Sequence, residues 1–291
     1  MKWKSTLQQA AFGILLTCAT ELIAKDEGNA KLSAKAERTV KLLKQQIQTE
    51  ISQLKNHPWA GEYYEGDGLG VNVSLAIVPK HGYVFEWRGC LGLYDRNYGN
   101  VTVTNGRIQL AFTFTNRQHG FQGIADELIP VPWGKRKYLV PAKNFIGFCN
   151  EVNSGSEPRK GLHGRFLLRC GDEKIKVTGT PTIPNEYKRC LLKQPVEAVI
   201  TKIGKTSTRP SKADFNVREA CVTINAGAKH NLQTGMELYV SSPHTLVETV
   251  ELTTVAETES EGVISQIIFK DEPEPQVGWK LSTRAPWHLN N

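Results

Sequence analysis

"VTVTNGRIQLAFTF", residues 101–114, decides the class of fold to which this chain belongs. Apolar residues occupy every second position on both sides of Asn105-Gly106, which is the side-chain period of a β-strand with one buried face. Asn-Gly between two such runs favours a two-residue turn that joins antiparallel strands. Residues 101–114 therefore predict a β-hairpin.

The same alternation extends toward the N-terminus of this hairpin. Residues 71–77 and 83–88 both place apolar side chains at every second position. Strands with one apolar face, joined by short polar turns, form an antiparallel meander. Such a sheet must close or be covered to bury its apolar face. We therefore expect residues 57–203 to form a β-rich domain, built as a small barrel or a curled sheet.

Residues 30–56 have a helical period instead. Polar residues fill the faces beside an apolar stripe, which consists of Ala36, Val40, Leu43, Ile47, Ile51 and Leu54. This pattern predicts an amphipathic helix that ends before Pro58, because the residue before a proline avoids the helical region. We expect the helix to pack on the domain that follows or to form a stalk; a short coiled-coil seam with a second copy is the alternative.

The pattern after residue 130 predicts further elements. Residues 141–153 form a second helix, with Pro141 in its first turn and Ser154-Gly155 as its end. Residues 164–170 and 173–177 form a hairpin around Gly171-Asp172, and residues 195–204 form one more strand. Residues 204–215 are polar, rich in turn formers and without a period, so they predict a linker.

The N-terminus predicts export. "MKWK" is a cationic segment, and "AAFGILLTCA", residues 10–19, is a short apolar segment that ends in small residues. This pattern is typical of a signal peptide over residues 1–19. "LLTC" also resembles a bacterial lipobox with Cys18 as the lipidated residue, although Thr17 stands where a smaller residue is usual. The expected location is the periplasm or outer envelope, with lipid anchoring left open and no transmembrane helix in the mature chain.

Charge and motif spacing restrict the function. The 291 residues carry a net charge of +7 without strong clustering, which predicts no nucleic-acid partner and permits an anionic one. No Cys-x-x-Cys pair, no metal-binding histidine spacing and no Gly-x-Ser-x-Gly occur. We therefore expect no metal, no cofactor and no catalytic residue. Disulfides and buried thiols both remain open for Cys90, Cys149, Cys170, Cys190 and Cys221.

Two segments carry candidate binding residues. "VPWGKRKYLV", residues 131–140, presents Trp133, Lys135, Arg136 and Lys137. These residues suit an anionic surface, a polysaccharide or an envelope protein, and a structural corner anchored by one aromatic ring is the alternative. The other segment is "GLYDRNYGN", residues 92–100. Its Tyr94 and Arg96 could bind a planar ligand by stacking and paired hydrogen bonds, and a polar turn is the alternative.

The C-terminal segment has its own strand and glycine pattern. It contains "CVTINAGAKHNLQTGMELYV", residues 221–240, and "TLVETVELTTVAETESEGVIS", residues 245–265. Residues 217–284 resemble the small SH3-like β-barrel at the C-terminus of flagellar assembly protein T and related bacterial envelope proteins. Asn231 stands where that pattern usually has a glycine. The resemblance implies a small β-barrel domain over residues 216–285 that serves binding or assembly in the envelope rather than catalysis.

These observations predict a mainly β fold and a function without catalysis. We expect an exported bacterial envelope protein that acts as a binding or assembly module for an unidentified partner. One alternative is a lipocalin-like carrier that holds a small apolar ligand in the 57–203 barrel, lined by Phe85, Trp87, Phe112 and Phe114. The other is a hydrolase with an unrecognised site near His119 or His163.

Overall fold

The computed structural model describes residues 30, 32–66, 72–115, 123–158, 166–210, 216–243, 248–268 and 273–286. The chain divides into two compact units. The first comprises Met1–Ala142 and Leu167–Gly179, and the second comprises Lys143–Phe166 and Thr180–Asn291. The predicted signal peptide, Cys18, His119 and His163 lie outside the described residues.

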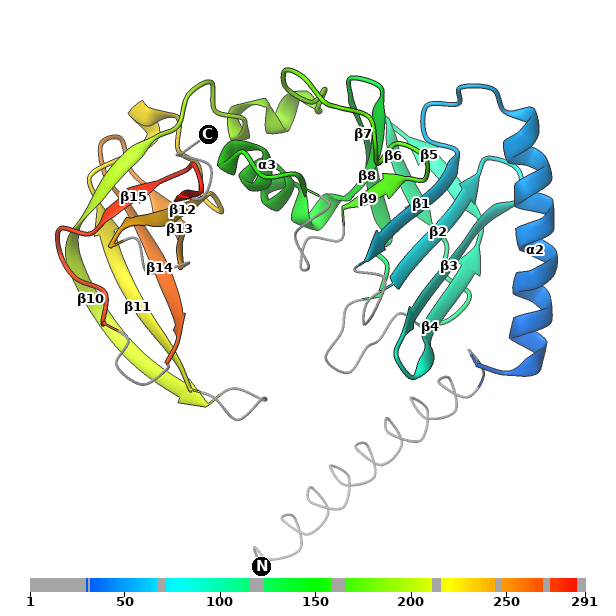
Figure 1. Cartoon of the computed structure of the whole chain (residues 1–291), viewed down its shortest axis with the longest axis horizontal. Coiled ribbons are helices and arrows are strands. Elements are labelled where there is room, and N and C mark those ends of the chain that lie inside the picture. Colours follow the sequence, from blue (N-terminus) through cyan, green and yellow to red (C-terminus); the bar gives the residue numbers. More distant parts are fainter. Residues whose placement is uncertain are drawn as a thin grey trace, which may run out of the picture. The chain divides into compact units, whose positions relative to one another are not determined.

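The first unit is an antiparallel sheet of nine strands in the order β4-β3-β2-β1-β9-β8-β7-β6-β5 (Figure 1). The segment after β6 hydrogen-bonds back toward β4, since Thr113 N donates to Tyr98 O at 3.2 Å, and the sheet is nearly closed into a barrel. The mainly β fold is confirmed. The strands are β1 (Gly61–Gly66), β2 (Asn72–Val78), β3 (Gly82–Gly89), β4 (Gly92–Gly99), β5 (Val101–Thr104), β6 (Arg107–Leu110), β7 (Glu127–Trp133), β8 (Arg136–Pro141) and β9 (Leu167–Arg169).

The hairpin predicted at residues 101–114 is confirmed as β5 and β6, with Thr104 opposite Arg107. Asn105 and Gly106 have φ values of 52° and 76°, the two positive angles that this type of tight turn requires. Strand β6 is shorter than predicted, because it ends at Leu110.

Helix α2 (Ala34–Gln53) covers strands β2 and β3 (Figure 1). The side chain of Ser33 caps its first turn by accepting a hydrogen bond from Ala36 N at 3.2 Å. Val40 and Ile47 are buried in the core of the same unit. The apolar stripe of the predicted helix therefore packs on the domain that follows it.

Two predictions in the first unit are wrong. Residues 173–177 form no strand, and β9 pairs with β1 and β8 instead. The reason is a side chain from elsewhere: Arg136 donates hydrogen bonds to the carbonyl oxygens of Glu173 and Ile175, which a hairpin would have used. The polar turn given as the alternative for residues 92–100 is also wrong, because residues 92–99 form strand β4.

The second predicted helix is confirmed as α3 (Phe145–Ser154), which follows the short 3-10 helix η1 (Ala142–Asn144). Gly155 ends it in the left-handed conformation, with φ 81°. Pro141 is the last residue of β8 rather than part of the first helical turn. Helix α3 belongs to the second unit, together with the 3-10 helix η3 (Asn185–Cys190).

The rest of the second unit is a closed barrel in the order β10-β11-β14-β13-β12-β15. A 3-10 turn, η4 (Ala228–His230), precedes Asn231, which has φ 63° and so takes the left-handed conformation open to glycine. The strands are β10 (Glu197–Pro210), β11 (Asn216–Ile224), β12 (Glu237–Ser242), β13 (Thr249–Val255), β14 (Ser260–Ile267) and β15 (Lys280–Ser282).

The linker predicted at residues 204–215 is wrong for residues 204–210. These residues continue β10 and pair with β11 as far as Pro210 opposite Asn216. Most side chains of this part of β10 are exposed, so the strand has no apolar period for the sequence to reveal. Residues 211–215 lie outside the described residues. The boundary between the units also differs from the expected one, since residues 143–166 and 180–203 belong to the second unit.

Candidate functional site

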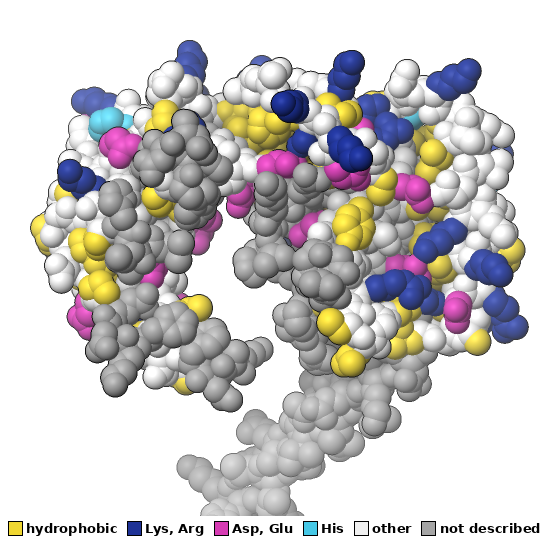
Figure 2. Space-filling model, in the orientation of Figure 1, with side chains coloured by type: hydrophobic (Ala, Val, Ile, Leu, Met, Phe, Trp, Pro, Cys, Tyr) yellow, Lys and Arg dark blue, Asp and Glu magenta, His cyan; other side chains and the backbone are white. Residues whose placement is uncertain are grey.

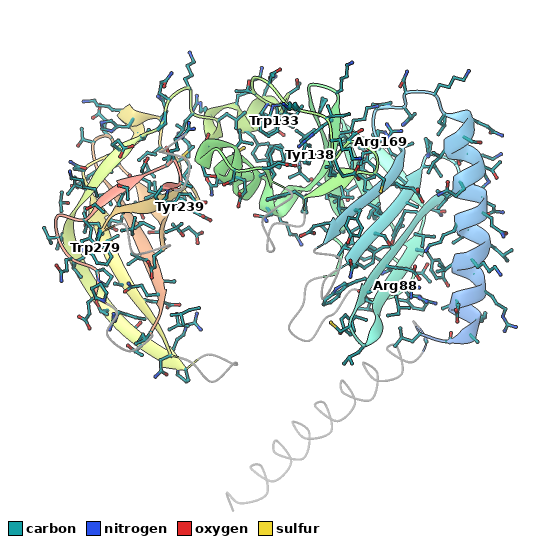
Figure 3. All side chains as sticks on the ribbon, in the orientation of Figure 1. Arg88, Trp133, Tyr138, Arg169, Tyr239 and Trp279 are labelled. Carbon is teal, nitrogen blue, oxygen red and sulfur yellow. The ribbon has the colours of Figure 1, made fainter. Side chains whose placement is uncertain are left out.

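The segment 131–140 forms the hairpin of β7 and β8, with Gly134 and Lys135 at its tip. Trp133 is only 8% exposed, and its Nε1 donates to Gly179 O at 3.0 Å (Figure 3). Arg136 is 6% exposed, and its Nη2 donates to Glu173 O at 3.2 Å. Both side chains therefore hold the segment that follows β9 against the sheet.

The two lysines of this hairpin differ. Lys135 is exposed. Lys137 is partly buried, and its Nζ donates to His57 O at 2.9 Å. Burial, together with the charge of Arg169, lowers the pKa of Lys137. The structure thus does not gather the four candidate residues into one exposed patch. Figure 2 likewise shows Lys and Arg side chains scattered over the visible face rather than gathered in one place.

The other predicted pair, Tyr94 and Arg96, is split between two sides of the sheet. A register shift between β3 and β4 lets the Tyr94 ring meet Trp87 edge-on, with centroids 5.3 Å apart. Arg96 lies opposite Glu86 in the pairing of β3 with β4, and its side chain contacts Glu86. Tyr94 is 41% exposed and Arg96 is 3% exposed. They do not form a common stacking platform.

Arg96 instead belongs to a group of charges that we call the Glu86 cluster: Lys44, Glu86, Arg88 and Arg96. The Glu86 carboxylate accepts from Lys44 Nζ at 2.6 Å, from Arg88 Nη2 at 3.2 Å and from Arg96 Nη2 at 3.3 Å. Helix α2 supplies the lysine, and β3 and β4 supply the other members, with Arg88 next to the last residue of β3 (Figure 3).

The balance of charge in the Glu86 cluster is positive, because three cations surround one carboxylate. Burial by itself would raise the pKa of Glu86, but the hydrogen bond from Lys44 and the charges of Lys44, Arg88 and Arg96 hold it below its usual range. Glu86 is therefore ionised at neutral pH, and the cluster keeps an excess of two positive charges.

The guanidinium of Arg96 is incompletely satisfied. Its Nε and Nη1 are buried and have no hydrogen-bond partner among the residues that the structure describes. A buried donor without a partner is rare and costs free energy. Lys44 and Arg88 share the Glu86 carboxylate with Arg96, and their side chains are 43% and 56% exposed. A guanidinium binds carboxylate and phosphate oxygens with paired N–H groups, so Nε and Nη1 of Arg96 would suit such an oxygen once the side chains that cover them move aside.

The opposite face of the same strands carries two buried carboxylates. Glu65 and Asp95 are 5% and 4% exposed. Cα partners across the sheet place Glu65, Val73, Trp87 and Asp95 in one row across β1 to β4, so their side chains share a face. The sequence analysis missed this row. A signal was present, because Glu65 is two residues from the buried Tyr63 and Asp95 is two residues from the buried Asn97, which places each carboxylate on the buried face of its strand.

The aromatic residues weighed as the lining of a ligand cavity do not share one environment. Phe85 and Trp87 are part of the hydrophobic core, and the partly buried Phe112 packs against it. Phe114 meets Tyr98 edge-on, with centroids 5.6 Å apart. Tyr98 lies on the other phase of β4 from Asn97, which opposes Phe85. These rings pack against protein neighbours in different places.

The described histidines nearest the sheet have structural contacts. His57 Nδ1 accepts from Ala60 N at 2.9 Å, and burial lowers the pKa of His57. His81 Nδ1 lies 2.7 Å from Glu50 Oε2 of helix α2. Within the described ranges, no three His, Cys, Asp or Glu side chains come together as a metal site. No described helix combines the length and the apolar character needed to cross a membrane.

No protein-family description matches this chain, and neither the curated proteins nor the solved structures give a significant match.

Proposed function

We propose that this chain is an exported, non-enzymatic protein of the bacterial envelope that acts as a binding module, and that its N-terminal unit binds an anionic group at the Glu86 cluster. The single observation that carries the site is the Arg96 guanidinium, which is 3% exposed and leaves Nε and Nη1 without partners in the described part of the chain. An anionic oxygen would satisfy these donors and offset the excess positive charge.

The ligand class is a phosphate or carboxylate group carried by an envelope component. Lys44 and Arg88 have long, partly exposed side chains that can turn from Glu86 toward an arriving anion, whereas Arg96 stays in place. The site therefore combines one fixed fork with two mobile cations. The signal-peptide pattern and the resemblance of residues 217–284 to envelope assembly domains support the location and the lack of catalysis.

The test uses the full chain and inorganic phosphate as the probe. Saturating phosphate should raise the melting temperature, because a ligand that binds only the folded state stabilises it. Lys44→Gln and Arg88→Gln should each weaken phosphate binding several-fold in calorimetric titration. Arg209→Gln is the matched control, since Arg209 forms an exposed ion pair with Glu219 in the second unit. Equal binding by all variants, or no binding by the unmodified chain, would refute the site.

The export part of the proposal has a separate test. The intact mass of the protein recovered from cells should correspond to cleavage after Ala19, or to a lipid-modified chain that begins at Cys18. Recovery of the uncleaved chain from the cytoplasm would refute export and leave the anion site untouched.

A further inference from the structure

Helix α3 and the 3-10 helix η3 lie side by side in the second unit, far apart in the sequence. The rings of Phe145 and Tyr187 stack with centroids 4.1 Å apart and planes at 26°. About two turns further along α3, Asn153 Nδ2 donates to Cys190 O at 2.9 Å, and Leu192 N donates to Asn153 Oδ1 at 2.9 Å. Asn153 therefore fixes the backbone on both sides of residue 191.

Cys149 lies between these two contacts. Residues 145, 149 and 153 are four apart, so they share one face of α3. Phe145 meets η3 at Tyr187 and Asn153 meets it at Cys190, and the same face of α3 thus directs Cys149 toward the end of η3. Cys149 and Cys190 are 0% and 6% exposed.

The two thiols also interact electrostatically. A hydrogen bond between the side chains raises the pKa of Cys149, and burial adds to this effect. The same hydrogen bond lowers the pKa of Cys190 against the opposing effect of burial. The opposite shifts indicate that the two thiols influence each other's ionisation.

We propose that Cys149 and Cys190 form a disulfide in the mature protein. The structure holds Cys149 and Cys190 as buried thiols, whereas the other described cysteines, Cys90, Cys170 and Cys221, are exposed, and Cys90 and Cys170 belong to the other unit. The inference goes beyond the proposed binding function. In the cell it requires the oxidising compartment proposed above, but the pairing itself can be examined with purified protein.

The reaction is a thiol–disulfide exchange with a disulfide-bearing oxidant, which is an oxidoreductase in the cell or oxidised glutathione in vitro. The thiolate of one of the two cysteines attacks one sulfur of the oxidant, forms a mixed disulfide and releases the first thiolate. The other cysteine then loses its proton and attacks the sulfur of the first, which releases the second thiolate from the oxidant. The two cysteines lose two electrons and two protons, and the oxidant becomes a dithiol or two thiols. Because both sulfurs are buried in the folded unit, the exchange takes place before α3 and η3 have packed.

The bond would close a loop that passes through both units. Between the two cysteines, the chain leaves the second unit, supplies β9 and residues 170–179 to the first, and returns at residue 180. Strand β9 pairs with both β1 and β8, so it is an interior strand of the first sheet. A disulfide between Cys149 and Cys190 would restrict the conformations of the segment between them in the unfolded chain and would thereby stabilise the folded chain.

The experiment refolds the reduced full chain in a mixture of oxidised and reduced glutathione. The intact mass should fall by two hydrogen atoms, and peptide mapping without reductant should link the peptides that contain Cys149 and Cys190. Addition of reductant should lower the melting temperature of the second unit by roughly 10 °C. The variant Cys149→Ala/Cys190→Ala should fold with a melting temperature that no longer responds to reductant.

The matched control is Cys90→Ser/Cys170→Ser/Cys221→Ser, which should keep both the mass change and the response to reductant. Alkylation of all five described cysteines after oxidative refolding, or a bond between any other pair, would overturn the proposal. Because refolding is done in vitro, this result does not depend on export. A disulfide in vitro together with reduced thiols in the mature protein from cells would show that the pair can form but does not form there, and would overturn the proposal while leaving export to its own test.

Discussion

The two units differ in where they keep charge, although both are antiparallel sheets that close or nearly close. All the buried charged side chains of the described chain belong to the first unit: Glu50, Glu65, Glu86, Asp95, Arg96 and Arg136. The buried polar side chains of the second unit are neutral: Asn150, Ser154, Ser241, Ser260, Gln266, Ser282 and Thr283. The two antiparallel sheets therefore differ in their interiors: the first unit buries charged side chains, and the polar side chains that the second unit buries are neutral.

This difference concerns how buried polar side chains affect the stability of each unit. Burying a charge costs several kcal/mol of desolvation free energy, and the favourable interaction within its ion pair roughly offsets this cost. Well-packed apolar residues would stabilise the first sheet at least as well, so stability alone does not account for its buried charges. In the second unit, hydroxyl and amide groups satisfy backbone atoms, as Ser260 Oγ does when it donates to Ala226 O at 2.7 Å.

The largest expected effect comes from removing the central charge of the first unit. Glu86→Gln leaves Lys44, Arg88 and Arg96 without a counter-charge, so we expect the free energy of unfolding to fall by about 3 kcal/mol. Urea unfolding measures this change. The control in the second unit is Glu219→Gln, whose exposed pair with Arg209 is worth about 0.5 kcal/mol or less. Similar losses in both variants would remove the contrast between the units.

A second effect concerns the buried guanidinium of Arg136, which holds the segment after β9. Arg136→Met would leave the carbonyl oxygens of Glu173 and Ile175 without this donor, and we expect a loss of about 2 kcal/mol. Arg136→Lys should recover only part of it, because an ammonium group lacks the planar fork. Full recovery with lysine, measured by thermal unfolding, would show that charge rather than geometry holds the segment.

The acid sensitivity of the first unit tests the same carboxylate by another route. The folded state holds the pKa of Glu86 below its usual value, through Lys44, Arg88 and Arg96. Its stabilising contribution is therefore present above the unfolded-state pKa of about 4.3 and is lost as the pH falls through the lower folded-state value. Unfolding free energy measured from pH 6 down to about pH 3 should fall less steeply in Glu86→Gln than in the unmodified chain. Identical slopes would mean that Glu86 does not control this acid response.

Local sequence patterns predicted the elements whose residues are close in the chain. Asn105-Gly106 predicted its hairpin, the stripe through Val40 and Ile47 predicted α2, and Gly155 marked the end of α3. In each case the signal is a turn, a cap or a period that neighbouring residues set by themselves.

The failures involve partners that are distant in the sequence. Arg136 captures carbonyls 37 and 39 residues away, and this contact removed the hairpin expected at 173–177. Lys44 and Glu86 are 42 residues apart in the sequence, so local patterns could not predict the Glu86 cluster. Only its member Arg96 was predicted as a binding residue, and it was paired with Tyr94. From the sequence of one strand we can predict only which of its charged residues share a face. Which of these charges form ion pairs depends on the helix that covers that face.

The smallest effect concerns a single turn of the second unit, where the proposed resemblance to small envelope barrels leads us to expect a glycine. Asn231 takes the left-handed conformation, with φ 63°, at the position where that pattern usually has a glycine. Asparagine tolerates this conformation better than other residues with a Cβ, and glycine adopts it without a steric cost. We therefore expect Asn231→Gly to change the free energy of unfolding by less than about 0.5 kcal/mol and Asn231→Ala to lower it by about 1 kcal/mol. Thermal unfolding of the two variants measures the difference. A loss with glycine as large as that with alanine would mean that the asparagine side chain, rather than its backbone angle, stabilises the turn, and the glycine pattern would then be no guide to this barrel.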